Sequence, residues 1–79
     1  MKRYESSQTG AIDMVATVLN CDPSKLSSES GIMTQPGWDS FAQIEIMIYL
    51  SEVYSIEIDD KNIEKYSNIK SIVDAFEGN

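Results

Sequence analysis

The sequence contains no histidine and only one cysteine, and basic residues are scarce in it. Because there is no second cysteine, Cys21 cannot form an internal disulfide. Without histidine the chain has no Ser-His-Asp triad, no Cys/His nucleophile pair and no ordinary zinc cluster, and it also lacks a G-x-S-x-G elbow. We therefore expect no catalytic residue and no metal site, and we expect Cys21 to be a small apolar residue at the end of an element.

Long apolar runs are missing as well. No stretch approaches the roughly 20 apolar residues that cross a bilayer, and none follows the two basic residues at the N-terminus. The 79 residues suffice for one small domain, which we place at 1–79 with a core over about 5–77. These features predict a soluble, cytoplasmic protein without a membrane span.

Acidic residues outnumber basic residues in the sequence. Six Lys and Arg stand against thirteen Asp and Glu, which gives a net charge of −7. No basic residue lies between Lys25 and Lys61, although acidic residues are frequent there. This balance disfavours nucleic acid and anionic membrane surfaces, and it favours a monomer that attracts basic partner proteins. The simpler alternative is that the acidity only keeps a small protein soluble.

Helical periodicity sets the predicted organisation. Apolar residues recur at helical spacing from Ala11 to Leu19, so a first helix is predicted there; its start could lie several residues earlier, although Gly10 weakens the pattern upstream. Residues 20–38 are rich in Asp, Ser, Pro and Gly without a sustained period, which predicts a long loop. Three apolar residues are expected to hold this loop against the core: Leu26, Ile32 and Met33.

The second half of the chain predicts three more helices. The second helix is predicted over Ser40–Tyr54, and a turn over 55–59 separates it from a short third helix over 60 to about 66. A last helix carries apolar residues at i, i+3, i+4 and i+7: Ile69, Ile72, Val73 and Phe76. The candidate caps are Asp59 or Asp60 for the third helix and Ser67 or Asn68 for the last. The predicted fold is all-α, a small four-helix bundle with three longer helices, a short third helix and a long first loop.

The second helix has apolar residues on two sides. On a helical wheel the core side is Ile46, Met47, Leu50, Val53 and Tyr54. The other side is Phe41, Ile44 and Ile48, bordered by Glu45 and Glu52. Either the long loop folds over Phe41 and Ile44, or this side binds a partner whose apolar groove is surrounded by Arg or Lys.

Ser40 stands at the predicted start of this helix. Ser40 and Gln43 fit the capping-box pattern S-x-x-Q, and Asp39 is the alternative cap. Either assignment puts Ser40 within one residue of the helix N-terminus, where free N–H groups and the positive end of the dipole favour a negative group. A phosphate ester on Ser40 would therefore be well tolerated.

Most of the chain resembles one family. The stretch GWDSFAQIEIMIYLSEVYSIEIDD resembles the region around the D-S-L motif of acyl carrier proteins, and KNIEKYSNIKSIVDAF matches the spacing of their last two helices. AIDMVATVLNCDPSKLSSES resembles their first helix and loop, so the resemblance covers about residues 11–76. It implies that a phosphopantetheinyl transferase, which holds the Mg²⁺ itself, attaches 4'-phosphopantetheine from coenzyme A to Ser40. Asp39 is the motif neighbour of that serine.

The resemblance also implies partners for the second helix. It makes the outer side of this helix the partner-recognition surface: Phe41, Ile44, Glu45, Ile48 and Glu52. Acyl chains would enter the core beside Ile46, Met47 and Leu50. The implied partners are the transferase, an acyl-loading ligase or synthase, and downstream acyl-transfer enzymes with basic docking patches. The protein would be a carrier and not an enzyme.

Two departures from the family pattern bear on the pathway. Ala42 and Ser51 stand where carriers of general fatty-acid synthesis usually have acidic residues, and a Trp-Asp-Ser sequence over 38–40 resembles carriers of specialised pathways.

We predict an acyl carrier for fatty acid, polyketide or specialised lipid biosynthesis. One alternative is an aminoacyl or peptidyl carrier for nonribosomal peptides or D-alanine, against which the acidity argues mildly. The other is a non-catalytic helical interaction module in which Ser40 is only a cap.

Overall fold

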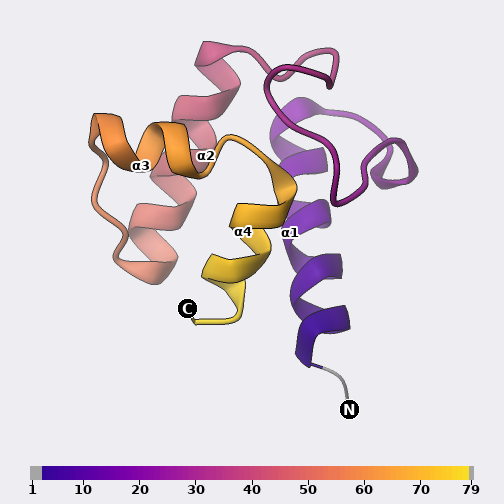
Figure 1. Cartoon of the computed structure of the whole chain (residues 1–79). Helices are drawn as coiled ribbons and strands as arrows, with labels where there is room; N and C mark the ends of the chain where they lie inside the picture. Colours follow the sequence, from indigo (N-terminus) through magenta and orange to yellow (C-terminus); the bar gives the residue numbers. More distant parts are fainter. Residues whose placement is uncertain (1–2, 79) are drawn as a thin grey trace.

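The computed structural model describes residues 3–78, and in this range it forms a bundle of four α-helices (Figure 1). They are α1 Arg3–Leu19, α2 Ser40–Tyr54, α3 Asp60–Lys65 and α4 Ile69–Phe76, and the first loop contains one 3-10 turn, η1 Pro23–Lys25. The predicted all-α bundle with a short third helix is confirmed. Within the described residues, no helix combines the length and the apolar character that a bilayer crossing requires.

The first helix begins at Arg3 and passes through Gly10 without a break. The glycine lies close to α4: a Cβ at position 10 would lie 3.1 Å from the ring of Phe76, which is tighter than ordinary contact. The absence of a side chain therefore lets the end of α4 approach α1 closely. The helical pattern could not account for Gly10, because the residue that packs against it, Phe76, lies 66 positions later in the chain.

Three helices begin with a side-chain cap of the same geometry. The side chains of Asp39, Asp59 and Asn68 each accept a hydrogen bond from the backbone N–H three residues later, at 2.8–2.9 Å. These bonds satisfy N–H groups that have no partner inside a helix, which fixes where α2, α3 and α4 begin. In α2 the cap is Asp39, so the capping box of Ser40 and Gln43 is wrong.

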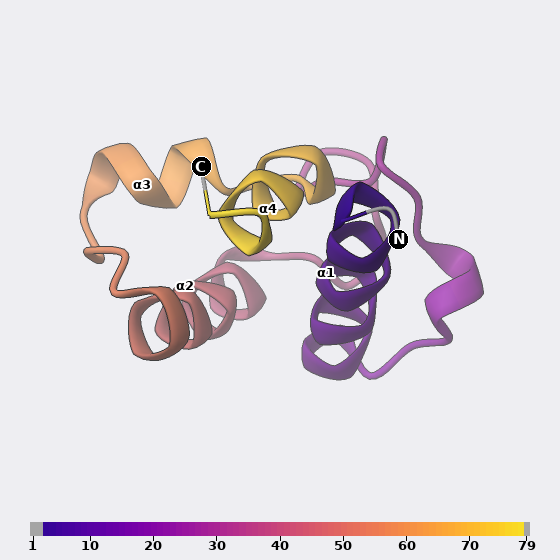
Figure 2. The same ribbon diagram turned by 90° about the horizontal axis from the view of Figure 1, so that it is seen from below.

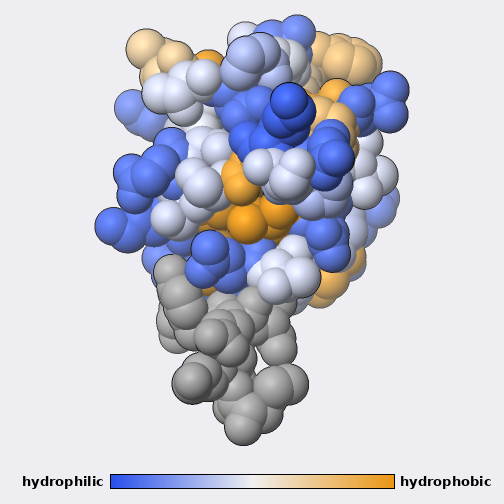
Figure 3. Space-filling view, turned by 90° about the vertical axis from the view of Figure 1, so that its right-hand side faces the viewer, coloured by the Kyte–Doolittle hydropathy of each residue, from blue (hydrophilic) through white to orange (hydrophobic). Residues whose placement is uncertain are grey.

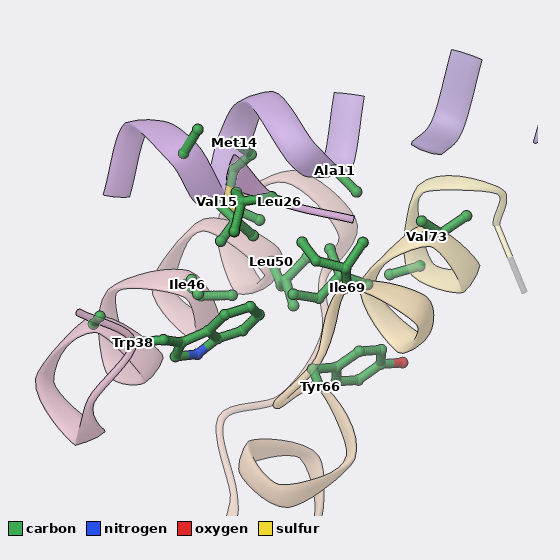
Figure 4. Close-up of a cluster of buried hydrophobic side chains, with 14 of the residues drawn as sticks. Ala11, Met14, Val15, Leu26, Trp38, Ile46, Leu50, Tyr66, Ile69 and Val73 are labelled. Atoms are coloured by element: carbon green, nitrogen blue, oxygen red, sulfur yellow. The ribbon is translucent and has the colours of Figure 1, made fainter. Parts of the chain in front are cut away.

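The core lies where α1, α2 and α4 meet, and α3 lies beside α2 on the same side as α4, away from α1 (Figure 2). Ile46, Met47 and Leu50 are fully buried, as predicted, and Figure 4 shows two of them among residues from α1 and α4. Val53 was assigned to the same side but is 52% exposed. The end of α4 does reach this part of α2, because the ring centroids of Tyr54 and Phe76 lie 5.1 Å apart, but Val53 is at the edge of the core side of the helical wheel and does not pack against the core.

The first loop is fastened to the bundle along its length. Leu26 is buried and Ile32 is half-buried against the core, but Met33 is 90% exposed and the prediction for it is wrong. Ile32 and Met33 lie in a turn, in which the Gln35 N–H donates to the Gly31 carbonyl at 2.8 Å, and this turn places Ile32 against the core and Met33 in solvent. From the side of α1 and this loop the surface is mostly hydrophilic, with a small apolar area (Figure 3). Cys21 packs against the core just after α1 ends, as expected.

Gly31 is the point where the loop crosses the start of α4. The Ile32 N–H donates to the Ser67 carbonyl and the Ile69 N–H donates to the Ser30 carbonyl, both at 2.9 Å. A Cβ at position 31 would lie 3.0 Å from the Ser67 carbonyl oxygen, which is backbone and cannot turn away.

We expect Gly31→Ala to lower the free energy of unfolding by about 1–3 kcal/mol, because the backbones of the loop and of α4 must separate to admit the methyl group. Urea denaturation followed by circular dichroism measures this change. The exposed Glu29→Ala is the control in the same loop and should change stability by less than about 0.5 kcal/mol. Equal stability of the two variants would contradict the close approach at Gly31.

Candidate functional site

Ser40 is the first residue of α2, and its side chain is exposed. The capping bonds are made by its neighbours: the Asp39 carboxylate accepts from the Ala42 N–H at 2.9 Å, and the Gln43 N–H donates to the Asp39 carbonyl at 2.9 Å. Among the described residues the Ser40 hydroxyl has no hydrogen-bond partner. The hydroxyl is therefore accessible and is not required to hold the helix start together.

The backbone around Ser40 suits a negative group. The N–H groups of Ser40 and Phe41 have no partner among the described residues. The Asp39 carboxylate accepts from the following N–H group, that of Ala42. Free N–H groups at a helix N-terminus carry a partial positive charge that stabilises a phosphate. An attached phosphodiester on the Ser40 oxygen would therefore lie close to these groups.

The outer side of α2 is an uncovered apolar strip, which we call the α2 strip. Its apolar members are 74% (Phe41), 40% (Ile44) and 44% (Ile48) exposed. Glu45 and Glu52 are exposed beside them and have no ion-pair partner among the described residues. The loop does not fold over Phe41 and Ile44, so that alternative is wrong, and the predicted exposed strip bordered by carboxylates is confirmed.

A buried polar contact lies under the start of α2, and the sequence patterns did not reveal it. Gln43 and Trp38 are each 2% exposed. The Trp38 indole N–H donates to Gln43 Oε1 at 2.7 Å, and Gln43 Nε2 donates to the carbonyls of Ile63 at 2.9 Å and Tyr66 at 3.0 Å. The available signal was the position of Gln43 on the core side of the wheel, where a lone amide must find partners.

The core beside the second helix is filled. The three residues beside which acyl chains were expected to enter, Ile46, Met47 and Leu50, have no exposed surface. A groove of about 390 Å³ lies elsewhere, between α1, Tyr49 of α2 and Phe76 of α4. A chain entering the core beside Leu50 would therefore have to displace packed side chains.

These features define a class of protein. An accessible hydroxyl at a helix start, an adjoining apolar and acidic strip, and the lack of histidine suit a protein that presents a covalently attached group to other proteins. They do not form a nucleophile paired with a base, which catalysis by Ser40 itself would need.

Comparison with known proteins agrees with this class. The family model described as "Phosphopantetheine attachment site" matches residues 11–76. The chain is 34% identical over 65 residues to an acyl carrier protein of Campylobacter concisus (strain 13826), covering 82% of this chain and 84% of that protein. It is 28% identical over 67 residues to an acyl carrier protein of Syntrophobacter fumaroxidans, covering 85% and 83%. The chain belongs to the acyl carrier protein family.

Membership of the acyl carrier protein family implies a covalently attached cofactor. Proteins of this family carry covalently attached 4'-phosphopantetheine, and they interact with the enzymes that modify them and with enzymes that handle acyl groups. They are carriers and not catalysts. The start of α2 fits the phosphate end of this group, because an unengaged hydroxyl and free N–H groups lie together there.

Proposed function

We propose that Ser40 is the residue to which 4'-phosphopantetheine is attached. The observation that carries this proposal is the exposed Ser40 hydroxyl at the first residue of α2, outside the capping bonds. Asp39 supports it in a structural way, because its carboxylate holds the helix start and so fixes the direction in which Ser40 points. Attachment would add charge where the helix dipole favours it and would break no hydrogen bond among the described residues.

In the attachment reaction the Ser40 oxygen would form a bond to the pantetheine-bearing phosphorus of coenzyme A. The bond from that phosphorus to the bridging pyrophosphate oxygen would break, and adenosine 3',5'-bisphosphate would leave. The Asp39 carboxylate is engaged by the Ala42 N–H and the chain has no histidine, so we infer that a base on the transferase takes the Ser40 proton. When bound, the arm supplies a terminal thiol that holds an acyl group as a thioester. The carrier then raises the effective concentration of that group at each enzyme it meets.

We propose the α2 strip as the docking surface for the transferase and for the acyl-handling enzymes. Phe41 is the most exposed of its apolar residues and adjoins Ser40, so an enzyme that reaches the hydroxyl also meets the ring. Glu45 and Glu52 would attract Arg or Lys around an apolar groove on the enzyme, and this attraction would mainly speed association. Partners with basic docking patches fit such a surface.

The cargo we propose is an acyl group of fatty acid, polyketide or specialised lipid biosynthesis. Support comes from the acyl carrier relatives, while the Trp-Asp-Ser sequence and the uncharged Ala42 and Ser51 favour a specialised pathway. We further propose that residues 1–79 act as one carrier domain, as a monomer in the cytoplasm. An aminoacyl or peptidyl cargo is the second candidate, because the same arm would carry it.

Incubation of the unmodified protein with coenzyme A, Mg²⁺ and a broad-specificity transferase tests the proposal. We expect the intact mass to increase by one phosphopantetheine unit. An unchanged mass would overturn the proposal and favour a helical interaction module. Offering the modified protein to acyl-loading and aminoacyl-loading ligases then separates the two kinds of cargo, since only the matching ligase forms a thioester.

A further inference from the structure

The Gln43 amide joins three parts of the chain that lie apart in the sequence. It contacts the end of the first loop through Trp38, it is itself part of the first turns of α2, and it reaches the end of α3 through the Ile63 and Tyr66 carbonyls. All three of its bonds are 2.7–3.0 Å long, and both Nε2 hydrogens are used. Figure 4 shows the Trp38 indole in the core, near Ile46 and Tyr66. Trp38 and Gln43 therefore form a buried hydrogen-bonded link in which each side-chain nitrogen and oxygen has a partner.

The third helix is short and has few tertiary contacts besides this connection: Ile63 packs half-buried against the core, and the Asn62 amide donates to the Glu57 carbonyl at 2.8 Å. The helix has six residues, and none of them is buried. A helix this short is not stable by itself. Its N-terminal end is held by Asp59, and two carbonyls at its C-terminal end, Ile63 and Tyr66, are satisfied by Gln43. Because the last carbonyls of a helix lack partners inside it, Gln43 acts as a C-terminal cap supplied by another helix.

The same residue braces the start of α2. The bond between Trp38 and Gln43 spans the segment 38–43, which contains the Asp39 cap and Ser40. One buried amide therefore contacts both the residue that precedes Asp39 and Ser40 and the end of α3. α3 stands beside α2 (Figure 1). Its exposed residues are charged: Asp60, Lys61, Glu64 and Lys65. An enzyme that docks on α2 near Ser40 would meet them.

We propose that Gln43, oriented by Trp38, is a positioning residue that holds α3 against α2 and thereby sets the shape of the surface that partner enzymes recognise. Because Gln43 is buried, it would act through α3 and the helix start and not by contact with a partner. This inference rests on the proposed function for its effect on partners, while the placement of α3 is independent of it.

The test uses Gln43→Met, which keeps the size of the side chain and removes all three bonds, and Trp38→Phe, which removes the indole bond and part of the buried ring. Backbone hydrogen exchange is measured on the unmodified proteins, and KM and kcat of a phosphopantetheinyl transferase are measured with each protein as substrate. For Gln43→Met we expect exchange in α3 to rise about 10-fold or more, with KM rising about 5-fold to 10-fold and kcat nearly unchanged. For Trp38→Phe we expect a rise of about 3-fold in the exchange of the same segment.

Gln8→Met, the same substitution on α1, is the matched control and should leave α3 exchange and KM unchanged. Exchange that rises equally in all helices of Gln43→Met, or remains at the wild-type rate in α3, would overturn the proposal. If Gln43→Met does not fold, Trp38→Phe decides: an increase confined to α3 supports the proposal, and no increase refutes it. If the wild-type protein accepts no phosphopantetheine, the proposed function fails, whereas the exchange result still decides the placement of α3.

Discussion

Replacing Ser40 with alanine is expected to abolish the gain of phosphopantetheine completely. The proposed bond is made to the Ser40 oxygen, and no other serine of α2 stands at its start: Ser51 lies in the fourth turn, far from the free N–H groups. Intact-mass measurement after incubation with coenzyme A, Mg²⁺ and transferase detects the loss. The expected change is from full modification to none.

The fold should survive this substitution, which makes the result interpretable. Asp39 caps α2, and the Ser40 hydroxyl has no hydrogen bond among the described residues, so alanine should change stability by less than about 0.5 kcal/mol. Ser51→Ala is the matched control and should be modified at the wild-type rate. A folded Ser40→Ala protein that still gained the unit would place the attachment on another residue.

The start of α2 shows how far local patterns reach. The bounds predicted for this helix, Ser40–Tyr54, agree with the structure, because a cap, a long apolar run and the following turn are all coded by neighbouring residues. The separation of Ile46 from Phe41 onto opposite sides also follows from helical geometry alone. Residue exposure on the outer side could be predicted because a domain of this size has little chain left to cover it.

Contacts between segments that lie far apart in the chain could not be predicted from the sequence. Val53 has the spacing of a core residue, but α4 packs on its neighbour Tyr54 instead, and the exposure of Met33 depends on the turn that follows Gly31. Gln43 fits a capping box by spacing, yet its amide is taken by Trp38 and the end of α3. Ser40 was singled out correctly as lying at the helix start, but the cap is its neighbour.

Truncating the apolar part of the α2 strip is expected to give the second large effect. Phe41→Ala combined with Ile48→Ala should raise the KM of the transferase on the order of 30-fold to 100-fold with little change in kcat. Both side chains are exposed in the free protein, at 74% and 44%, so their removal costs the fold little. In a complex they would be the apolar anchors of the interface, where a few residues carry most of the binding free energy. Steady-state kinetics with the carrier as the varied substrate measures the effect.

Val53→Ala separates docking from a general effect of surface apolar residues. Val53 is 52% exposed on the same helix but lies outside the α2 strip, so its truncation should change KM by less than about 2-fold. A KM that rises equally for Val53→Ala would show that the strip has no special role. A fall in kcat without a change in KM for the Phe41→Ala, Ile48→Ala protein would also contradict docking. A lost docking contact should weaken the binding of the carrier to the transferase and leave the rate of the attachment step unchanged.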